Sequence, residues 1–262
     1  MSATLGGLLK DYRLQYNISQ LEVALALGWK ETSRLSRIEQ GKIFKPTREL
    51  LERIMDAMKL KEEEKNQLLY IGNYLPTRKE IEKIQKFTLP MIEKWPYPAT
   101  VFDFTERVIL NNQVLFKLYK VNKKQQKDIH KYNPYLLELI YDPNFILNKN
   151  KNKKFIQNRR EYLREDLAHY IFEQKSRQKD KWFLDLIKKM TNNSLFLAVW
   201  EEVTQSKKPT CPITLPIKEA FNPDTDLRLN TYLFKVILNL DPRFFILFYI
   251  PTDKETLKYF NQ

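Results

Sequence analysis

The segment from Ile18 to Gly41 constrains the fold of this 262-residue chain more than any other feature. Its apolar residues recur at helical spacing, first at Val23, Ala24 and Leu27, then at Leu35 and Ile38. Gly28 lies between the two groups, where a left-handed backbone conformation is often required. The pattern therefore predicts two short crossed helices, and the small side chain of Ala24 permits their close approach.

The same segment resembles the Cro/repressor-type helix-turn-helix family, also called the xenobiotic response element family. The resemblance rests on Ser-Gln at residues 19–20 and Ser-Arg-Ile-Glu-x-Gly at residues 36–41, and it covers about residues 5–60. It implies a five-helix, lambda-repressor-like domain that binds double-stranded DNA as a homodimer. The stretch from Gly28 to Glu39 is one residue longer than the usual pattern, so the turn or the start of the second helix must absorb an insertion.

The resemblance also implies which side chains contact DNA. Gln20 is expected to bind a phosphate, and Lys30 is expected to contact DNA near the point where the insertion falls. The remaining DNA contacts are expected from Thr32, Ser33 and Arg37 at base edges, and from Ser36, Lys42 and Lys45 at the backbone. Simpler roles stay open: Ser33 as a helix cap, Arg37 as the partner of a surface carboxylate, and Gln20 as a solvated side chain. Glu39 is interpreted as structural.

The glycines mark a domain boundary, because all five occur within the first 72 residues. We therefore predict a DNA-binding domain over residues 1–76, a helical linker over 77–97 and a second domain over 98–262. The linker carries an apolar stripe, and Pro90, Pro96 and Pro98 are expected to interrupt the chain.

The second domain is predicted to mix helices with short strands rich in β-branched and aromatic residues. The protein would thus combine a helical domain with an α+β domain containing an antiparallel sheet. Strands are expected at 99–102, 107–110, 213–217, 232–240 and 244–250, and helices at 113–119, 135–141, 159–176, 182–190, 195–203 and 254–260.

Several landmarks after Pro98 resemble the ligand-binding domain of MmyB-like regulators, which has a PAS-like fold. They are Pro98-Ala99, Asp103, Val108, Asn112, the segment 133–143, the Phe196/Trp200 pair and the strand ending at Tyr249-Ile250-Pro251. The resemblance implies a sensor for a small hydrophobic ligand such as a fatty acid. The candidate pocket residues are Tyr135, Phe196, Trp200, Phe234 and Tyr249, and for any single one of them a filled core is the favoured interpretation. A protein- or peptide-interaction module without a small-molecule ligand is the alternative.

Charge and composition narrow the function further. The net charge is +13, but residues 1–76 carry 12 Lys and Arg against 10 Asp and Glu, a net of +2. The basic stretches Lys123–Lys131 and Lys149–Arg160 hold much of the remaining excess. They either attract phosphate or form a solvated Lys/Asn-rich loop, and we favour the loop.

Other classes of function lack their motifs in this sequence. The chain has no His-Glu-x-x-His, no phosphate-binding glycine loop and no dinucleotide-binding turn, so we expect no enzyme and no cofactor. A lone cysteine, Cys211, excludes an intrachain disulfide and a cysteine-rich zinc site. The N-terminus lacks a signal-peptide pattern and the longest apolar run has seven residues, so a cytoplasmic protein without a membrane span is expected.

Overall fold

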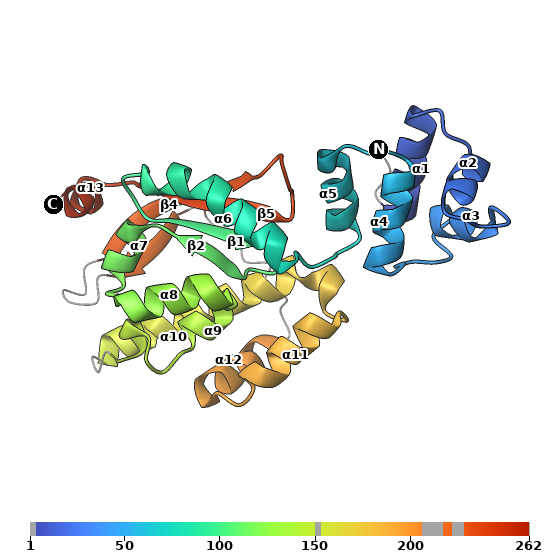
Figure 1. Cartoon of the computed structure of the whole chain (residues 1–262). Coiled ribbons are helices and arrows are strands. Elements are labelled where there is room, and N and C mark those ends of the chain that lie inside the picture. Colours follow the sequence, from blue (N-terminus) through green and yellow to red (C-terminus); the bar gives the residue numbers. More distant parts are fainter. Residues whose placement is uncertain (1–3, 150–152, 206–216, 222–227, 262) are drawn as a thin grey trace. The chain divides into compact units, whose positions relative to one another are not determined.

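The computed structural model describes residues 4–149, 153–205, 217–221 and 228–261, which form two compact units (Figure 1). The first unit comprises Met1–Arg78 together with Ile237–Phe244, and the second comprises Lys79–Val236 together with Phe245–Gln262. No helix in these described ranges is long and apolar enough to cross a membrane.

The first unit contains the five predicted helices. They are α1 (Leu5–Gln15), α2 (Gln20–Ala26), α3 (Ser33–Glu39), α4 (Arg48–Ala57) and α5 (Glu62–Ile71). Local signals fix several of their starts. Ser19 and Glu22 form a capping box before α2, and the Thr47 hydroxyl accepts the Leu50 N–H at the start of α4. Three glutamates occupy the first turn of α5, where the positive end of the helix dipole stabilises them.

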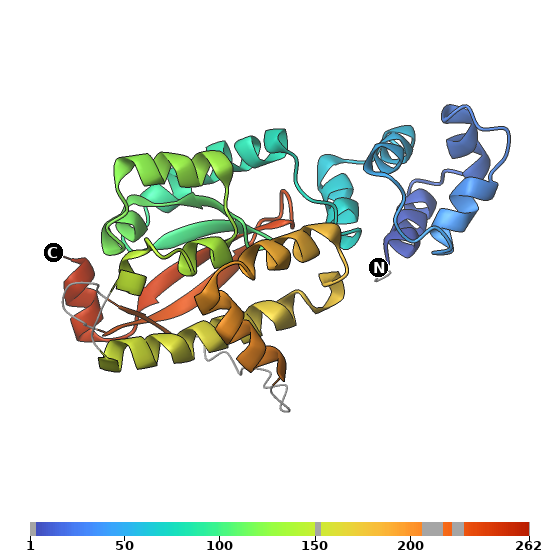
Figure 2. The same ribbon diagram turned by 90° about the horizontal axis from the view of Figure 1, so that it is seen from below.

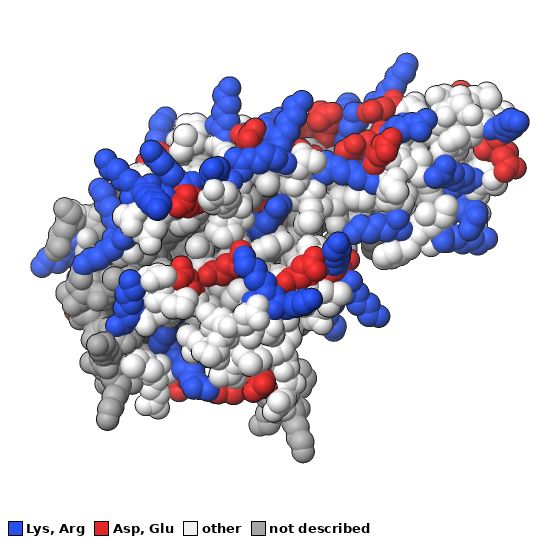
Figure 3. Space-filling model, turned by 60° about the horizontal axis from the view of Figure 1, so that its bottom comes forward, with Lys and Arg blue, Asp and Glu red and all other residues white. Residues whose placement is uncertain are grey.

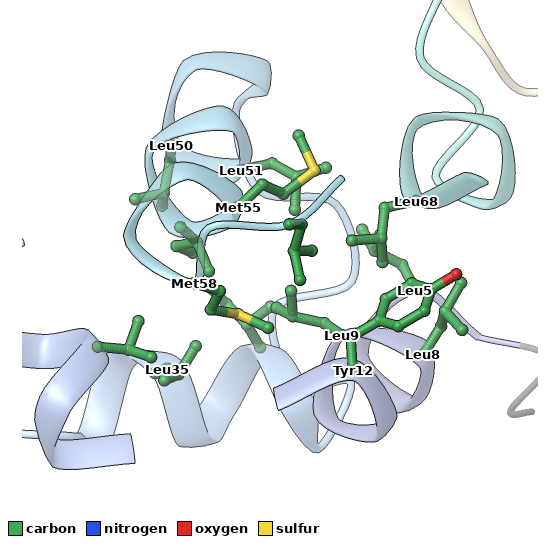
Figure 4. Close-up of a cluster of buried hydrophobic side chains, with 14 of the residues drawn as sticks. Leu5, Leu8, Leu9, Tyr12, Leu35, Leu50, Leu51, Met55, Met58 and Leu68 are labelled. Atoms are coloured by element: carbon green, nitrogen blue, oxygen red, sulfur yellow. The ribbon is translucent and has the colours of Figure 1, made fainter. Parts of the chain in front are cut away.

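A single apolar core joins all five helices of this unit (Figure 4). Leu8 and Leu9 of α1 are fully buried, as are Leu35 of α3 and Leu51 of α4, and Leu68 joins them from α5. Burial of side chains of this size contributes about 1.5–3 kcal/mol each, before the entropy cost of ordering them. The core therefore holds α3 rigidly against α1 and α4.

Helix α1 approaches α3 so closely that one position must be glycine. A Cβ atom added at Gly6 would lie 2.1 Å from the backbone oxygen of Ile38. Alanine is favoured over glycine inside a helix by about 1 kcal/mol, so propensity alone predicts that Gly6→Ala stabilises the protein. We expect the opposite, a loss of about 1–3 kcal/mol, because the two backbones must move apart. Chemical denaturation of the full chain checks the sign, and an unchanged or higher stability would contradict this packing.

The second unit is built on a five-stranded sheet in the order β2-β1-β5-β4-β3. Its strands are β1 (Ala99–Asp103), β2 (Val108–Asn111), β3 (Ile217–Phe221), β4 (Arg228–Ile237) and β5 (Phe244–Pro251). The pairs β1–β2 and β3–β4 are antiparallel. The turn at 241–243 joins β4 to β5, as predicted, and the Leu238 N–H donates to the Phe244 carbonyl beside it. Of the strand predicted at 213–217, residues 213–216 lie outside the described part of the chain, as does Cys211.

Helices cover both faces of this sheet. Helix α6 (Arg78–Glu93) lies on one face, and α8 (Lys123–Tyr132), α9 (Leu136–Ile140) and α10 (Lys153–Glu173) lie on the other (Figure 1). Figure 2 views the unit from the side of α10. The remaining helices are α7 (Gln113–Leu118), α11 (Lys181–Met190), α12 (Ser194–Gln205) and α13 (Lys254–Phe260), with 3-10 turns at Ile146–Lys149 and Lys175–Arg177.

Three expectations for this region need correction. Helix α6 continues through Pro90, which was expected to interrupt the chain. The stretch Lys123–Lys131, interpreted as a loop, is helix α8, which begins with a capping box between Asn122 and Gln125. Lys153–Arg160, in the second basic stretch, belongs to helix α10. Helix α6 itself occupies most of the range predicted as a linker, and it is counted with the second unit from Lys79 onward.

His130 secures the outer strand of the sheet to α8. Its Nε2 atom accepts the Asn111 N–H at 3.2 Å, which requires a neutral imidazole, and burial lowers the pKa of His130 below its usual value of about 6.5. The unfolded chain therefore binds this proton more readily, so the second unit loses stability as pH falls below about 6.5. Thermal unfolding between pH 7.5 and pH 5.5 tests this. His130→Gln keeps an acceptor without titrating, and we expect a flatter pH dependence; an unchanged slope in this variant would contradict the role of His130.

Candidate nucleic-acid interface

The turn between α2 and α3 sets the direction in which α3 projects from the first unit. Gly28 adopts a φ of 74°, in the left-handed region predicted for it. The Trp29 N–H then donates to the Ala24 carbonyl at 2.9 Å and closes the C-terminal end of α2. Leu35 and Ile38 are both fully buried. Because these two residues fix the inner side of α3, the residues between them form its outer side.

A buried ion pair fastens α3 to the helices before it. The Arg13 guanidinium donates to both Glu39 carboxylate oxygens, at 2.6 Å and 3.0 Å, and to the Ile18 carbonyl at 2.8 Å. The hydrogen bond to Glu39 raises the pKa of Arg13 above its usual value. The Gln20 amide also donates to Glu39, at 2.7 Å. Glu39 is thus structural, as interpreted, and links α1, α2 and α3 through one carboxylate.

The outer side of α3 is polar and open. Ser33 and Arg37 are exposed, and Thr32 and Ser36 are half-buried. The Arg37 guanidinium has no hydrogen-bond or ion-pair partner among the described residues, so the alternative role of Arg37 as the partner of a surface carboxylate is not found there. The Ser36 hydroxyl accepts the Gln40 amide at 2.9 Å, and the Ser33 hydroxyl donates to Glu31 at 2.8 Å.

The start of α3 differs from the expected caps. Thr32 occupies the cap position in a helical conformation, and its side chain makes no capping hydrogen bond. Ser33 is already the first helical residue, and its hydroxyl is directed to Glu31 rather than to the helix backbone.

Basic residues lie just before, within and after α3 in the sequence. Lys30 and Lys42 are exposed and have no side-chain partner among the described residues. Lys45 instead donates to the Asn73 carbonyl at 3.1 Å and lies 5.4 Å from the Tyr74 ring centre, so it is held against the end of α5. Sequence reasoning omitted Arg34, whose guanidinium lies 5.3 Å from the centre of the Trp29 ring. Arg34 could have been included as a candidate DNA contact, because it lies in the first turn of the predicted second helix.

The Gln20 side chain has a structural partner and one N–H donor left over. An amide group has two N–H donors, and only one is used by Glu39. The second N–H can donate to a phosphate near the start of α2 while the first keeps the side chain in place.

Two short helices, α2 and α3, are joined at the left-handed Gly28, and the second of them has an open polar side. Residues 4–68 match the helix-turn-helix domain family. The matched range begins just before α1 and ends within α5, so this helix-turn-helix domain includes α3 and its buried ion pair. No curated protein matches the chain.

Outside the helix-turn-helix domain, the five candidate pocket residues do not all lie together. Tyr135, Phe196 and Trp200 belong to one cluster, built with side chains of α9, α10, α11 and α12. Phe196 stacks on Trp200 at 5.7 Å between ring centres, and Tyr135 stacks on Trp182 at 5.9 Å. Phe234, on β4, is 60% exposed, and Tyr249, on β5, is half-buried. In the described part of the chain, no group of His, Cys, Asp or Glu side chains is arranged to hold a metal ion.

Proposed function

We propose that this protein is a sequence-specific DNA-binding transcription regulator that acts as a homodimer and inserts α3 into the major groove. The observation that carries the proposal is the open side of α3 within the matched helix-turn-helix domain. An arginine can bind the O6 and N7 atoms of guanine through two hydrogen bonds, and serine hydroxyls can bind several base edges. Arg37 and Ser33 are the exposed residues that provide these groups.

The distribution of charge in the first domain supports the same face. Residues 30–45 contain five basic residues, Lys30, Arg34, Arg37, Lys42 and Lys45, against two acidic ones. One of those two, Glu39, is neutralised by Arg13. Six of the ten acidic residues in 1–76 fall between residues 49 and 64. The modest net charge of this domain therefore conceals a local positive surface around α3; several Lys and Arg side chains of the first unit are visible at the right of Figure 3.

The test is a binding titration with full-length protein on two duplexes of equal length, one selected from random DNA by the protein and one with the same bases shuffled. We expect tighter binding to the selected duplex by about 10³-fold or more at physiological salt. Equal affinity for both duplexes would contradict sequence-specific recognition.

For the second unit, we propose a PAS-like sensor of a small amphipathic molecule. The strand order β2-β1-β5-β4-β3, with the helices α7 to α12 between β2 and β3, supports a PAS-like fold. The Tyr170 hydroxyl, in the same helical cluster as Tyr135, is buried and has no hydrogen-bond partner among the described residues. Burial raises the pKa of Tyr170, so its hydroxyl is neutral and able to donate. A ligand with a polar group at this point would satisfy the hydroxyl.

Native mass spectrometry of the purified chain tests the sensor. We expect a mass increase of a few hundred daltons for an acyl-chain ligand, lost in Tyr170→Phe if the hydroxyl binds its polar group. Protein that carries no added mass after exposure to a mixture of fatty acids would contradict this part of the proposal.

A further inference from the structure

We infer that the outer side of α8, in the second unit, binds the phosphate backbone of duplex DNA without reading its sequence. The inference rests on the proposed function, because its ligand is the duplex that α3 is proposed to read, and it adds a second DNA-binding surface to the chain. Three observations carry it: a stripe of exposed lysines, the conflict between these lysines and the helix that holds them, and an inner side of α8 that is already packed on the sheet.

Four exposed lysines lie along one side of α8. Lys123, Lys127 and Lys131 recur every four residues, and Lys124 lies beside them on the helix surface. We call these four residues the α8 lysine stripe. The stripe extends for about 12 Å, at 1.5 Å per residue, and one strand of DNA carries about three or four phosphates over that length. Its length and charge therefore allow it to follow a phosphate backbone.

The protein does little to neutralise the α8 lysine stripe. The first three lysines of the stripe have no ion-pair partner among the described residues. Lys131 lies 4.9 Å from the centre of the Tyr132 ring, a contact that leaves its charge in place. Asp128 is the one acidic residue of α8. The stripe thus presents an uncompensated positive charge to the solvent, which attracts polyanions.

The stripe also belongs to the more basic part of the chain. Residues 77–262 carry 33 Lys and Arg against 22 Asp and Glu, a net of +11, whereas residues 1–76 carry a net of +2. Within the larger part, residues 117–131 contain six lysines and one aspartate. A role in DNA binding gives this excess a function that the helix-turn-helix domain alone does not.

The lysines of the stripe oppose the stability of their own helix. Lys123 and Lys124 occupy the first turn of α8, which contains no acidic residue, and the positive end of the helix dipole repels them there. Lys123, Lys127 and Lys131 place like charges four residues apart, which is also unfavourable. Residues that contradict the local preference of their element are expected at functional sites. The charge pattern of α8 therefore points to a ligand and not to the stability of the fold.

The inner side of α8 is occupied, which favours DNA over a membrane as the partner. Ile129 packs against the core cluster that contains Phe102 and Phe245, and the His130 Nε2 atom accepts the Asn111 N–H. A helix that lies on a membrane buries its apolar face among the lipids. In α8 that face is packed on the sheet, and phosphates of a duplex require only the outer side.

The residue type favours contacts with the backbone of DNA over contacts with bases. All four residues of the stripe are lysines, and an ammonium group binds a phosphate as a point charge. Paired hydrogen bonds to guanine are more typical of arginine. Because α8 and α3 belong to one chain, a duplex held by the first unit meets the stripe at a high effective concentration. The stripe should therefore add affinity without adding sequence preference.

The salt dependence of DNA binding tests the α8 lysine stripe. The full-length variant Lys123→Gln/Lys124→Gln/Lys127→Gln/Lys131→Gln is titrated onto the shuffled duplex at several salt concentrations. Each phosphate contact contributes about 0.9 to the slope of log affinity against log salt concentration. We expect the slope to fall by about two to three and the affinity at physiological salt to fall by at least about ten-fold. A fall in slope of less than about one would overturn the inference.

A second quadruple variant with the same net charge is the matched control. Lys175, Lys179, Lys181 and Lys188 are exposed lysines on α11 and just before it, and replacing all four with glutamine also removes four positive charges. We expect this variant to keep the wild-type slope to within about one. Equal falls in both variants would show that the net charge alone matters, and would overturn the inference.

Thermal unfolding and lipid binding exclude two other roles for the stripe. The stripe variant should unfold at the same temperature as the wild type or a higher one, because repulsion along α8 is removed. A lower unfolding temperature would assign the lysines to the fold and overturn the inference. Binding to phosphatidylserine vesicles that depends on the stripe, with no change in DNA binding, would also overturn it.

The ratio of the affinities for the selected and the shuffled duplex separates this inference from the proposed function. The stripe variant should keep the wild-type ratio, because the stripe contacts no base. A wild type without sequence preference would contradict the proposed function, whereas an unchanged salt dependence in the stripe variant would contradict the second surface alone.

Discussion

Replacing Glu39 with alanine is expected to lower the stability of the helix-turn-helix domain by about 3–5 kcal/mol, the largest effect of any substitution considered for this chain. The side chains of Arg13 and Glu39 are only 7% and 2% exposed. Glu39→Ala leaves the Arg13 charge buried without its partner and removes the acceptor of Gln20. Hydrogen exchange in the full chain measures the effect locally, through the amides of α1 and α3.

Two controls separate the buried charge from general damage. Arg13→Met/Glu39→Leu removes both charges, and we expect it to recover most of the lost stability, because a buried pair can often be replaced by apolar residues at little cost. Lys65→Ala removes a pair with Asp56, whose side chain is 66% exposed, and should cost no more than about 1 kcal/mol. A loss below about 1 kcal/mol in Glu39→Ala would contradict the structural role of the pair.

Arg37→Ala is expected to weaken binding to the selected DNA sequence by about 1–3 kcal/mol, or about 5- to 150-fold. Its guanidinium is exposed on α3 and has no partner among the described residues, so it is available to bind a base. Affinity for shuffled DNA should change much less, because phosphate contacts dominate there. Fluorescence anisotropy with both duplexes measures the difference.

A lysine on the same face is expected to behave differently from Arg37. Lys42→Ala should weaken binding to both duplexes alike and reduce the salt dependence by about one phosphate contact. Equal losses on both duplexes for Arg37→Ala would assign Arg37 to the backbone instead of the bases.

The first domain was predictable because its signals are local. The left-handed Gly28 and the inward spacing of Leu35 and Ile38 each act within a few residues, and the structure confirms both. The capping box of Ser19 and Glu22 is an equally local signal. Less could be predicted where side chains from distant segments meet. Nothing near Gln20 in the sequence shows that its amide binds Glu39, nineteen residues away.

In the second unit, less of the structure follows from local sequence signals and more depends on contacts between distant segments. Strands β1, β2, β4 and β5 were located from composition, whereas β3 shares only Ile217 with the strand predicted at 213–217. The strand order β2-β1-β5-β4-β3 depends on pairing between segments far apart in the chain. Helix α8 was interpreted as a loop because its lysines dominate the composition. Its start nevertheless carries a local signal, the Asn122 cap with Gln125 three residues later, which was available in the sequence.

The central claim is that the open side of α3 reads base edges, and the most direct test compares the DNA sequences selected by three proteins. Wild type, Arg37→Ala and Lys10→Ala each select from the same random library; Lys10 is an exposed lysine on α1, so both variants lose one positive charge. We predict that Arg37→Ala loses its preference at one or two adjacent base pairs of each half-site, while Lys10→Ala selects the wild-type sequence. An unchanged selected sequence for Arg37→Ala would contradict the account.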